Sequence, residues 1–273
     1  MRPDGAPLPV LERYELKFTI PPELVEPISS FVETYCYMDS HSTSSPAGFY
    51  QVNSLYFDTP EYLFLRNRLD RIPDRFNMRV RSYGARPVLP YFLEVKQKKE
   101  SIIRKYRARI REENLEHVLD PAREDHACLV SPGEAENAAL FRRLAHIHNA
   151  SPVVMTSYRR KAYISNCDEY ARVTFDIGLR YMAQREYKPL SIGEGMAPSD
   201  VETCFDENTS VILELKCYSQ YVPLWMVDLI RAFELTRRGF SKYSAGMAQV
   251  FRRYAFEDGS RVPPSFGMRR GKL

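Results

Sequence analysis

Three neighbouring stretches decide the fold: Arg79-Val-Arg-Ser-Tyr83, Leu93-Glu-Val-Lys-Gln-Lys-Lys99 and Ile103-Arg-Lys-Tyr-Arg-Ala-Arg-Ile-Arg111. Successive side chains of an extended strand point to opposite faces, so an alternation of charged and apolar residues places all charges on one face. Arg79 and Arg81 alternate with apolar residues in this way, and basic residues occupy every second position from Lys105 onward. The stretches therefore predict neighbouring strands that each have a charged face.

A single strand of this kind is typical of the solvated face of an antiparallel sheet. The same alternation recurs, however, in Glu15-Leu-Lys17, Arg172-Val-Thr-Phe-Asp176 and Leu213-Glu-Leu-Lys216. Solvated faces usually mix Ser, Thr, Gln and both charges, whereas these strands repeat Lys or Arg with an acid nearby. We therefore expect the strands to close into a barrel with the charged side chains inside and the apolar ones outside, under covering helices.

A barrel of this kind has a basic lumen. Two cations about 6 Å apart at an effective dielectric constant of about 20 repel each other by roughly 3 kcal/mol. An empty lumen is therefore costly, and a bound polyanion relieves the cost. The net charge of the chain is only +4, which argues against a general nucleic-acid coat and for local clustering of the basic residues.

Composition also bears on compartment and on metal sites. The five cysteines lack a C-x-x-C pair, which fits reduced thiols in the cytoplasm better than a disulfide framework. The pair His146-x-His148 lacks the spacing that brings two zinc ligands to one helical face. The chain has no apolar run of about 20 residues and no signal-peptide pattern at its start, so we expect a soluble, cytoplasmic protein.

The chain is predicted to fold as one domain over residues 10–256, with a loose lead-in at 1–9 and a flexible basic tail at 257–273. Beyond the three stretches above, strands are expected at 10–20, 50–57, 153–165, 170–179 and 211–217. Amphipathic helices are expected at 23–37, 60–69, 112–119, 134–149, 223–236 and 243–255. Residues 39–48 and 180–209 are expected to be mostly loops.

A series of short motifs carries a family resemblance. In chain order they are Arg13-x-Glu15-x-Lys17, Leu55-Tyr-Phe-Asp58-Thr, Arg79-x-Arg81, Glu94-x-Lys96, Arg104-Lys105, Tyr158-x-Arg160-x-Ala162-Tyr163, Arg172-Val-Thr-Phe-Asp176, Leu213-Glu214-Leu-Lys216 and Ser241-Lys242-Tyr243. Over about residues 10–255 the chain thereby resembles the VTC domain, the catalytic domain of polyphosphate polymerases within the CYTH or triphosphate tunnel metalloenzyme superfamily. Each motif alone is weak, but their common order is specific.

The resemblance implies an α+β fold in which an antiparallel β-strand tunnel, a closed CYTH-like barrel, carries covering helices. It further implies transfer of the terminal phosphoryl group of ATP to inorganic polyphosphate, release of ADP, and a divalent metal, Mn²⁺ or Mg²⁺. Phosphate-binding roles are implied for Lys17, Arg79, Arg81, Lys96, Lys105, Arg160, Arg172, Lys216 and Lys242. By the same resemblance, Glu214 is the metal ligand, and Lys242, Glu214 and Arg160 carry the catalysis; Arg104 is an alternative to Lys105.

Two positions depart from the superfamily pattern. Hydrolytic members usually begin with Glu-x-Glu-x-Lys, but Arg13 stands where the first glutamate would be. VTC domains share this loss, which removes a second metal site and favours transfer over hydrolysis. A lysine expected one turn before Lys242 is absent, since position 239 is glycine, and Arg237 or Arg238 is a candidate replacement.

Several functions remain compatible with the sequence. The alternatives are a triphosphatase or adenylate cyclase of the same architecture, a non-catalytic polyphosphate or inositol-phosphate sensor, and a protein that binds single-stranded nucleic acid. The predicted partners are ATP and polyphosphate, without nucleic acid and without direct insertion into a membrane. The sequence leaves open whether a membrane protein receives the polymer.

Overall fold

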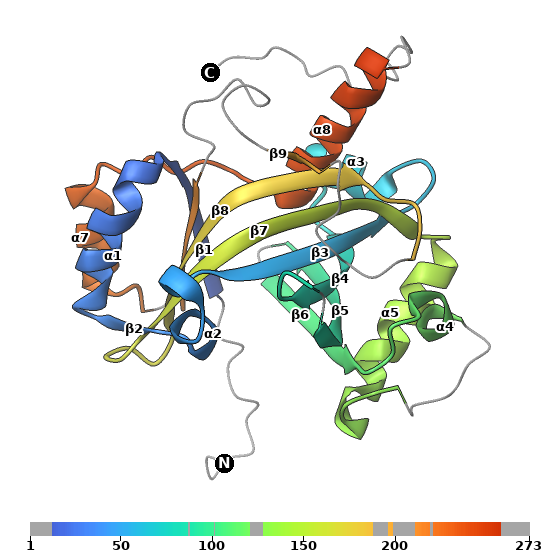
Figure 1. The fold of residues 1–273 in the computed structure, drawn as a ribbon, viewed down its shortest axis with the longest axis horizontal. Coiled ribbons are helices and arrows are strands. Elements are labelled where there is room, and N and C mark those ends of the chain that lie inside the picture. Colours follow the sequence, from blue (N-terminus) through green and yellow to red (C-terminus); the bar gives the residue numbers. More distant parts are fainter. Residues whose placement is uncertain are drawn as a thin grey trace.

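The computed structural model describes residues 13–86, 88–100, 102–120, 128–187, 196–198, 211–218 and 221–257. Its centre is an antiparallel sheet in which the strands follow the order β1-β10-β8-β7-β3-β4-β5-β6 (Figure 1). The strand bounds are β1 Arg13–Ile20, β3 Tyr50–Asp58, β4 Arg75–Tyr83, β5 Val88–Lys99, β6 Ile102–Ile110, β7 Ser151–Ser165, β8 Ala171–Ala183 and β10 Val211–Tyr218. The short strands β2 (Cys36–Met38) and β9 (Ala197–Pro198) pair with β7 and β8.

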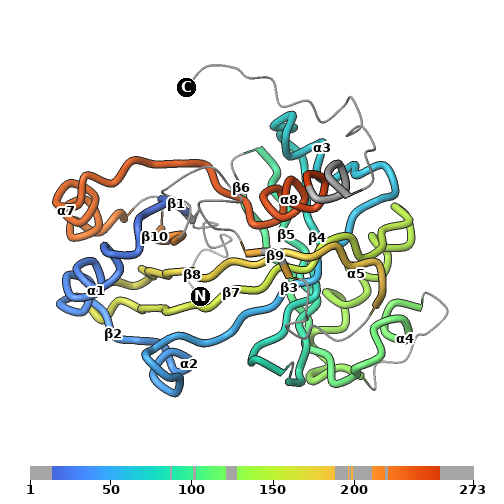
Figure 2. Tube along the Cα trace, turned by 45° about the horizontal axis from the view of Figure 1, so that its top comes forward, coloured from blue at the N-terminus to red at the C-terminus, as the bar shows by residue number. Residues whose placement is uncertain are grey.

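The sheet is strongly curled. The long strands β3, β7 and β8 cross the molecule, and β4, β5 and β6 run across them (Figure 2). Lys96 on β5 lies 2.6 Å from Glu15 on β1, although these strands stand near opposite ends of the strand order. The face that carries these two side chains must therefore be the concave one, and we call it the inner face.

The expected closed barrel is replaced by a half-barrel. Within the described ranges, no backbone hydrogen bonds join β6 to β1, so these two strands are the edges of the sheet. Closure of a barrel requires a continuous hydrogen-bonded ladder. Here side chains approach each other across the gap instead, as the ion pair between Lys96 and Glu15 shows. The α+β class and the antiparallel sheet with covering helices agree with the sequence-based expectation.

Helices cover the outer, apolar face of the sheet. Helices α1 (Val25–Glu33) and α7 (Leu224–Ala232) bury Ile28 and Leu229 against Val173 and Leu213 of the sheet. Helix α5 (Ala135–Ile147) buries Phe141 in a second core with residues of β4, β5 and β6. The remaining helices are η1 Pro22–Leu24, α2 Ser40–Thr43, η2 Pro46–Gly48, α3 Leu63–Leu69, α4 Leu115–Leu119, η3 Pro132–Glu134 and α8 Lys242–Glu257.

The expected lead-in at 1–9 and the expected tail, apart from Glu257, lie outside the described residues, as do 199–210 and most of 188–198. None of the helices within the described ranges combines the length and apolar character needed to cross a membrane.

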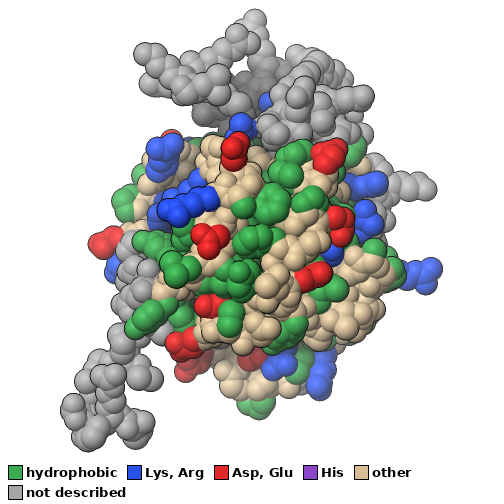
Figure 3. Space-filling view, turned by 90° about the vertical axis from the view of Figure 1, so that its left-hand side faces the viewer, with side chains coloured by type: hydrophobic (Ala, Val, Ile, Leu, Met, Phe, Trp, Pro, Cys, Tyr) green, Lys and Arg blue, Asp and Glu red, His purple; other side chains and the backbone are tan. Residues whose placement is uncertain are grey.

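On the face formed around α1 and α7, hydrophobic, acidic and basic side chains are mixed (Figure 3). Among the described side chains, no patch of a single charge therefore dominates this face.

Candidate functional site

The inner face brings the predicted phosphate-binding residues together from separate strands. Each residue belongs to the charged phase of its strand or, for Lys242, to the first turn of α8. Those in ion pairs with carboxylates on this face are Lys17, Arg79, Arg81, Lys96, Lys105, Arg160, Lys216 and Lys242. Arg172 lies opposite Lys216 in the ladder and pairs with Asp39 at 2.6 Å.

One charge cluster is organised by Glu94 of β5, and we call it the Glu94 centre. Its side chain is 2% exposed and lies 2.7 Å from each of Arg79, Lys105 and Arg107, with Arg81 at 4.0 Å. The ladder explains this arrangement, because Arg79 and Arg107 are the direct neighbours of Glu94 on β4 and β6. Burial by itself raises the pKa of Glu94, but the surrounding cations, Arg81 and Arg79 above all, hold it well below its usual range. Glu94 is therefore ionised.

A second cluster, the Glu214 centre, lies on β10 and its neighbours. The Oε1 atom of Glu214 is 3.1 Å from Lys17 and 3.5 Å from Lys242, and Oε2 is 2.9 Å from Lys216 and 4.0 Å from Arg160. Burial alone raises the pKa of Glu214, but Lys17 and Lys216 lead the cations that hold it well below its usual range. The carboxylate is thus charged and shared among several cations.

Asp176 of β8 completes the Glu214 centre. It is fully buried and accepts two hydrogen bonds from Arg160, at 2.6 and 2.7 Å, in the bidentate geometry that suits a guanidinium. The ammonium of Lys242 lies 2.5 Å from Oδ2 of Asp176, the oxygen that also accepts from Nη2 of Arg160. Burial lowers the pKa of Lys242, but Asp176 and Glu214 together raise it above its ordinary value. Arg160 and Lys242 are therefore held charged, side by side, at one end of the cluster.

Glu15 of β1 connects the two walls of the half-barrel. Its carboxylate lies 2.6 Å from Lys96, 3.2 Å from Lys17 and 3.8 Å from Lys216. Burial raises the pKa of Glu15, but attraction to Lys17, with help from Lys96 and Lys216, lowers it to about 2. Glu15 therefore remains an anion that ties β5 to β1 and β10.

Cations outnumber the carboxylates on the inner face. The cations are Lys17, Arg79, Arg81, Lys96, Lys105, Arg107, Arg160, Arg172, Lys216 and Lys242, and the carboxylates that pair with them are Glu15, Asp39, Glu94, Asp176 and Glu214. Each carboxylate neutralises only part of the positive charge around it. The face therefore has an excess of positive charge in a partly desolvated space, which suits a ligand with several negative charges.

Sequence reasoning missed some of these residues. The motifs contain Glu15, Glu94 and Asp176, but the sequence alone assigns them no role, and it does not single out Arg107 or Asp39. Their spacing was the available signal, because Glu94 is two residues from Lys96 and Arg107 is two residues from Lys105. Lys105 contacts Glu94, whereas Arg104 lies opposite Gln97, so the geometry favours Lys105, and its phosphate-binding role stays a prediction.

An aromatic ring supports the Glu214 centre. Tyr158 of β7 is buried, and the Lys242 ammonium lies 4.7 Å from the centroid of its ring. The guanidinium of Arg160 lies 5.4 Å from the same centroid, and Arg81 donates a hydrogen bond of 3.4 Å to the phenol oxygen. Tyr158 thus contacts cations of both charge clusters and fixes their spacing.

Lys242 is positioned by the next residue of α8. The hydroxyl of Tyr243 donates to the carboxylate of Asp58, which also accepts from the backbone N–H groups of Phe64 and Leu65 at the start of α3. The ring of Tyr243 stacks on Tyr56 with centroids 5.1 Å apart. The first turn of α8 is therefore anchored to β3 and α3, and Lys242 in this turn lies beside Asp176 and Glu214.

Tyr243→Phe should lower the free energy of unfolding by about 1–3 kcal/mol, because a buried carboxylate loses one of its donors. The matched control is Tyr163→Phe, which removes a hydrogen bond of 2.8 Å to Glu33, an exposed carboxylate that water can solvate. Urea denaturation of both variants checks the prediction. Equal losses in the two variants would show that Asp58 does not depend on Tyr243.

The donor set bears on the implied metal ion. Among the described residues, no group of three or more His, Cys, Asp or Glu side chains is close enough to hold a metal ion by itself. Glu214 and Glu15 are neighbours, since both contact Lys17 and Lys216. Mg²⁺ and Mn²⁺ favour oxygen ligands, and Mg²⁺ is usually held by one or two carboxylates together with phosphate oxygens. The residues present fit an ion of that kind, which shares its coordination with a phosphate ligand.

The replacement of the missing lysine stays a prediction. The side chains of Arg237 and Arg238 are exposed, and the backbone N–H of Arg238 donates to the carbonyl of Lys17 at 3.0 Å. The loop before α8 therefore lies against β1, close to the Glu214 centre. Arg13, the other departure, begins β1 opposite Tyr218.

A model of the VTC domain family matches residues 12–251. No curated protein sequence matches the chain. Among solved structures, a putative adenylate cyclase from Bacillus halodurans is similar at 11% identity and a TM-score of 0.48, covering 85% of this chain and 94% of that one. A putative adenylyl cyclase from Hippeastrum, described as having a dominant triphosphatase activity, is similar at 14% identity and a TM-score of 0.44, covering 93% and 98%.

Proposed function

Since the chain belongs to the VTC domain family, we propose that it is a polyphosphate polymerase, which transfers the terminal phosphoryl group of ATP to a growing inorganic polyphosphate chain and releases ADP. One observation carries the proposal: lysines and arginines from separate strands converge on one face, where buried carboxylates neutralise only part of their charge. Both the substrate and the product of this reaction are polyanions.

Phosphoryl transfer suits this set of residues. Negative charge spreads over the equatorial oxygens of the transferred group, so catalysis is mostly positioning and electrostatic stabilisation. Arginine supplies a bidentate fork to phosphate, and lysine supplies a point charge. Arg160 and Lys242 are already charged and held together by Asp176. In the proposed reaction they turn from Asp176 and Glu214 toward the phosphate oxygens without any change of protonation.

The remaining cations would bind different parts of the phosphate chain, according to their positions on the inner face. The Glu94 centre offers Arg79, Arg81 and Lys105 to one stretch of phosphates, and the Glu214 centre offers Lys17 and Lys216 to another. Glu214, with Glu15 beside it, would hold a divalent ion that neutralises charge on the phosphate oxygens. In the proposed reaction the two centres would thus bind the nucleotide and the polymer end on the same charged face.

The direct test is to incubate the purified protein with ATP and manganese and to identify the products. We expect ADP and a long polymer that a polyphosphate stain reveals on a gel. Orthophosphate without polymer would instead indicate a triphosphatase, and pyrophosphate with a cyclic nucleotide would indicate an adenylate cyclase. Binding of polyphosphate without any metal-dependent turnover of ATP would indicate a sensor.

Lys105 makes ligand binding depend on pH. Burial lowers the pKa of Lys105 to about 7, and the attraction of Glu94 offsets only part of that effect. A bound polyanion favours the ammonium form, so the pKa rises on binding and the protein takes up a proton. The affinity for tripolyphosphate should therefore fall, by up to about tenfold per pH unit, as the pH rises above about 7.

Calorimetric titration with tripolyphosphate between pH 6.5 and about 8.5, in buffers of different ionisation enthalpy, measures this proton uptake. The control is Lys105→Arg, which keeps the positive charge but does not titrate in this range. Because the protonation of tripolyphosphate itself contributes equally to both proteins, the difference between them isolates Lys105. Identical pH dependence in the two proteins would rule out this role.

A further inference from the structure

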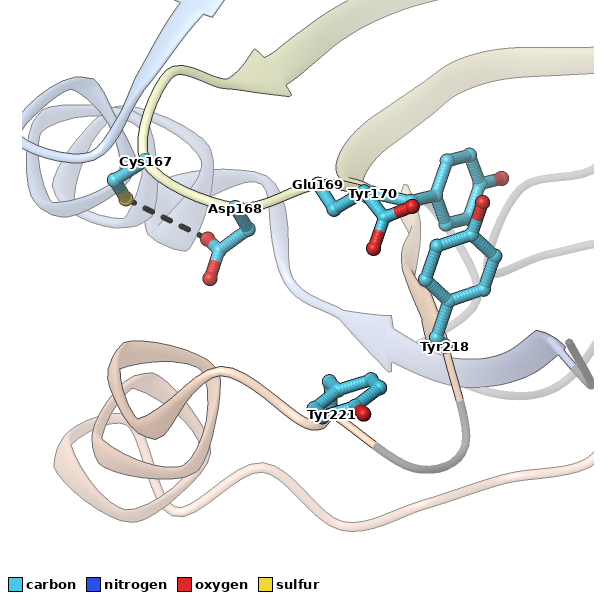
Figure 4. Close-up of a pocket in the computed structure, with 6 residues that line it drawn as sticks. All are labelled: Cys167, Asp168, Glu169, Tyr170, Tyr218 and Tyr221. Atoms are coloured by element: carbon cyan, nitrogen blue, oxygen red, sulfur yellow. Dashed lines mark hydrogen bonds between the residues drawn. The ribbon is translucent and has the colours of Figure 1, made fainter. Parts of the chain in front are cut away.

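A small pocket lies at one end of the sheet (Figure 4). It lies between the turn that joins β7 to β8 and the connection from β10 to α7. It has a volume of about 240 Å³ and is lined by Cys167, Asp168, Glu169, Tyr170, Tyr218 and Tyr221. Pockets for drug-sized ligands usually have about 300–1,000 Å³. We call it the tyrosine pocket, and its size suits a single ring system.

The tyrosine pocket continues the row of inner-face side chains. Tyr218 follows Lys216 by two residues on β10, so both side chains lie on the same face of the sheet. Arg172 lies opposite Lys216, and Tyr170 precedes Arg172 by two residues. The rings of Tyr170 and Tyr218 lie side by side, with centroids 5.0 Å apart. An aromatic wall thus begins where the row of cations ends, about 7 Å farther along the strands.

We propose that the tyrosine pocket binds the nucleobase of the nucleoside triphosphate, with the base stacked on Tyr170 and Tyr218; the inference rests on the proposed function. A base needs an aromatic surface and no counter-charge, whereas a triphosphate needs cations. From the end of the sheet inward, the aromatic rings of Tyr170 and Tyr218 come first, and the cations Lys216 and Arg172 follow directly. The nucleotide then enters from this end, and its phosphates point toward Glu214 and Lys242.

The acidic residues of the pocket have different roles. Asp168 already accepts hydrogen bonds from Ser165 at 2.6 Å and from the indole N–H of Trp225 at 2.8 Å, which hold the turn against α7. Glu169 is exposed at the pocket rim, where its carboxylate can accept from an exocyclic amino group of a base. Tyr221 is 67% exposed on the opposite side of the pocket, so a bound base would also cover this ring.

The test compares two ligands that differ in the nucleoside. Calorimetry measures the affinity of the full chain for inorganic tripolyphosphate and for adenylyl imidodiphosphate, an ATP analogue that resists transfer of its terminal phosphoryl group. Tyr170→Ala and Tyr218→Ala should each weaken binding of the analogue by about 5-fold or more, since stacking on one aromatic ring contributes that much. Their affinity for tripolyphosphate should stay within about twofold of the wild type, which also shows that the variants are folded.

Two controls sharpen the result. Tyr218→Phe keeps the ring and should keep the affinity for the analogue. Tyr37→Ala removes a tyrosine on β2 that is 55% exposed and does not line the pocket, so it should change neither affinity. Equal losses for both ligands in the alanine variants, or unchanged binding of the analogue, would overturn the base pocket.

This experiment separates the base pocket from the proposed function. If the wild type binds tripolyphosphate and the alanine variants leave both affinities unchanged, the base pocket fails while a phosphate-binding enzyme remains in place. If the tyrosine variants lose the analogue selectively but no polyphosphate is made from ATP, the base pocket stands and the polymerase activity fails. If the wild type binds neither ligand, both proposals fail together.

Discussion

Glu214→Gln should reduce polyphosphate synthesis from ATP by at least about 100-fold, while the protein still binds polyphosphate. The substitution keeps the size of the side chain but removes its charge, and a neutral amide is a poor ligand for a divalent ion. Removal of one preorganised electrostatic contact to a reacting group typically costs about 100- to 1,000-fold in rate. Lys17, Lys216 and Lys242 also lose their shared anion, which leaves the site more positive. Binding of a polyanion should therefore persist or become tighter.

Steady-state rates and a polyphosphate-binding titration on the same preparation check this prediction. Glu214→Ala should likewise lose polyphosphate synthesis and keep polyphosphate binding. The matched control is Glu134→Gln, which removes a carboxylate that pairs with Arg109 at 2.7 Å, outside both charge clusters. The control should retain most of its activity. Full activity in Glu214→Gln would exclude Glu214 from the reaction.

The sequence predicted which side chains face inward because alternation in a strand depends only on local geometry. Arg79, Arg81 and Lys96 could thus be assigned to one face without knowledge of their neighbours. The partners of these side chains depend on the register between strands and on curvature. Lys96 pairs with Glu15, which is 81 residues away in the chain, and no local pattern indicates that contact. For the same reason the ends of the sheet, and thus the open half-barrel, were not predictable.

Helix starts show a similar limit. Thr59 and Pro60 match the signals of a helix N-terminus, yet α3 begins at Leu63, after Tyr62 with a φ of 55°. The buried carboxylate of Asp58 explains the later start, because it accepts from the backbone N–H groups of Phe64 and Leu65. That interaction depends on the burial of Asp58 beneath α8, which is a tertiary effect. In residues 39–48, likewise, Asp39 caps a short helix that composition alone did not indicate.

Glu94→Gln should lower the free energy of unfolding by about 3–5 kcal/mol in the absence of ligand, because removal of one partner from a buried ion pair leaves unneutralised charge. Arg79, Lys105 and Arg107 would then face one another without their common anion. A polyanion can take the place of that anion. Saturating polyphosphate should therefore raise the thermal midpoint of Glu94→Gln more than that of the wild type. A ligand that binds only the folded state stabilises a protein by about 2.7 kcal/mol at a hundredfold excess over Kd, and the variant should gain more than this.

The control for this second prediction is Glu134→Gln, since Glu134 pairs at 2.7 Å with Arg109, whose side chain is 42% exposed and lies outside both charge clusters. Exposed ion pairs contribute about 0–1 kcal/mol, so this variant should unfold nearly as the wild type does and should gain no additional stabilisation from polyphosphate. Thermal denaturation of the three proteins, with and without polyphosphate, measures both effects. If Glu94→Gln is destabilised but polyphosphate stabilises it no more than the wild type, the cations around Glu94 serve the fold and do not bind the polymer. A larger stabilisation assigns them to both tasks, because the same arginines and lysines would then exchange an internal carboxylate for phosphate oxygens.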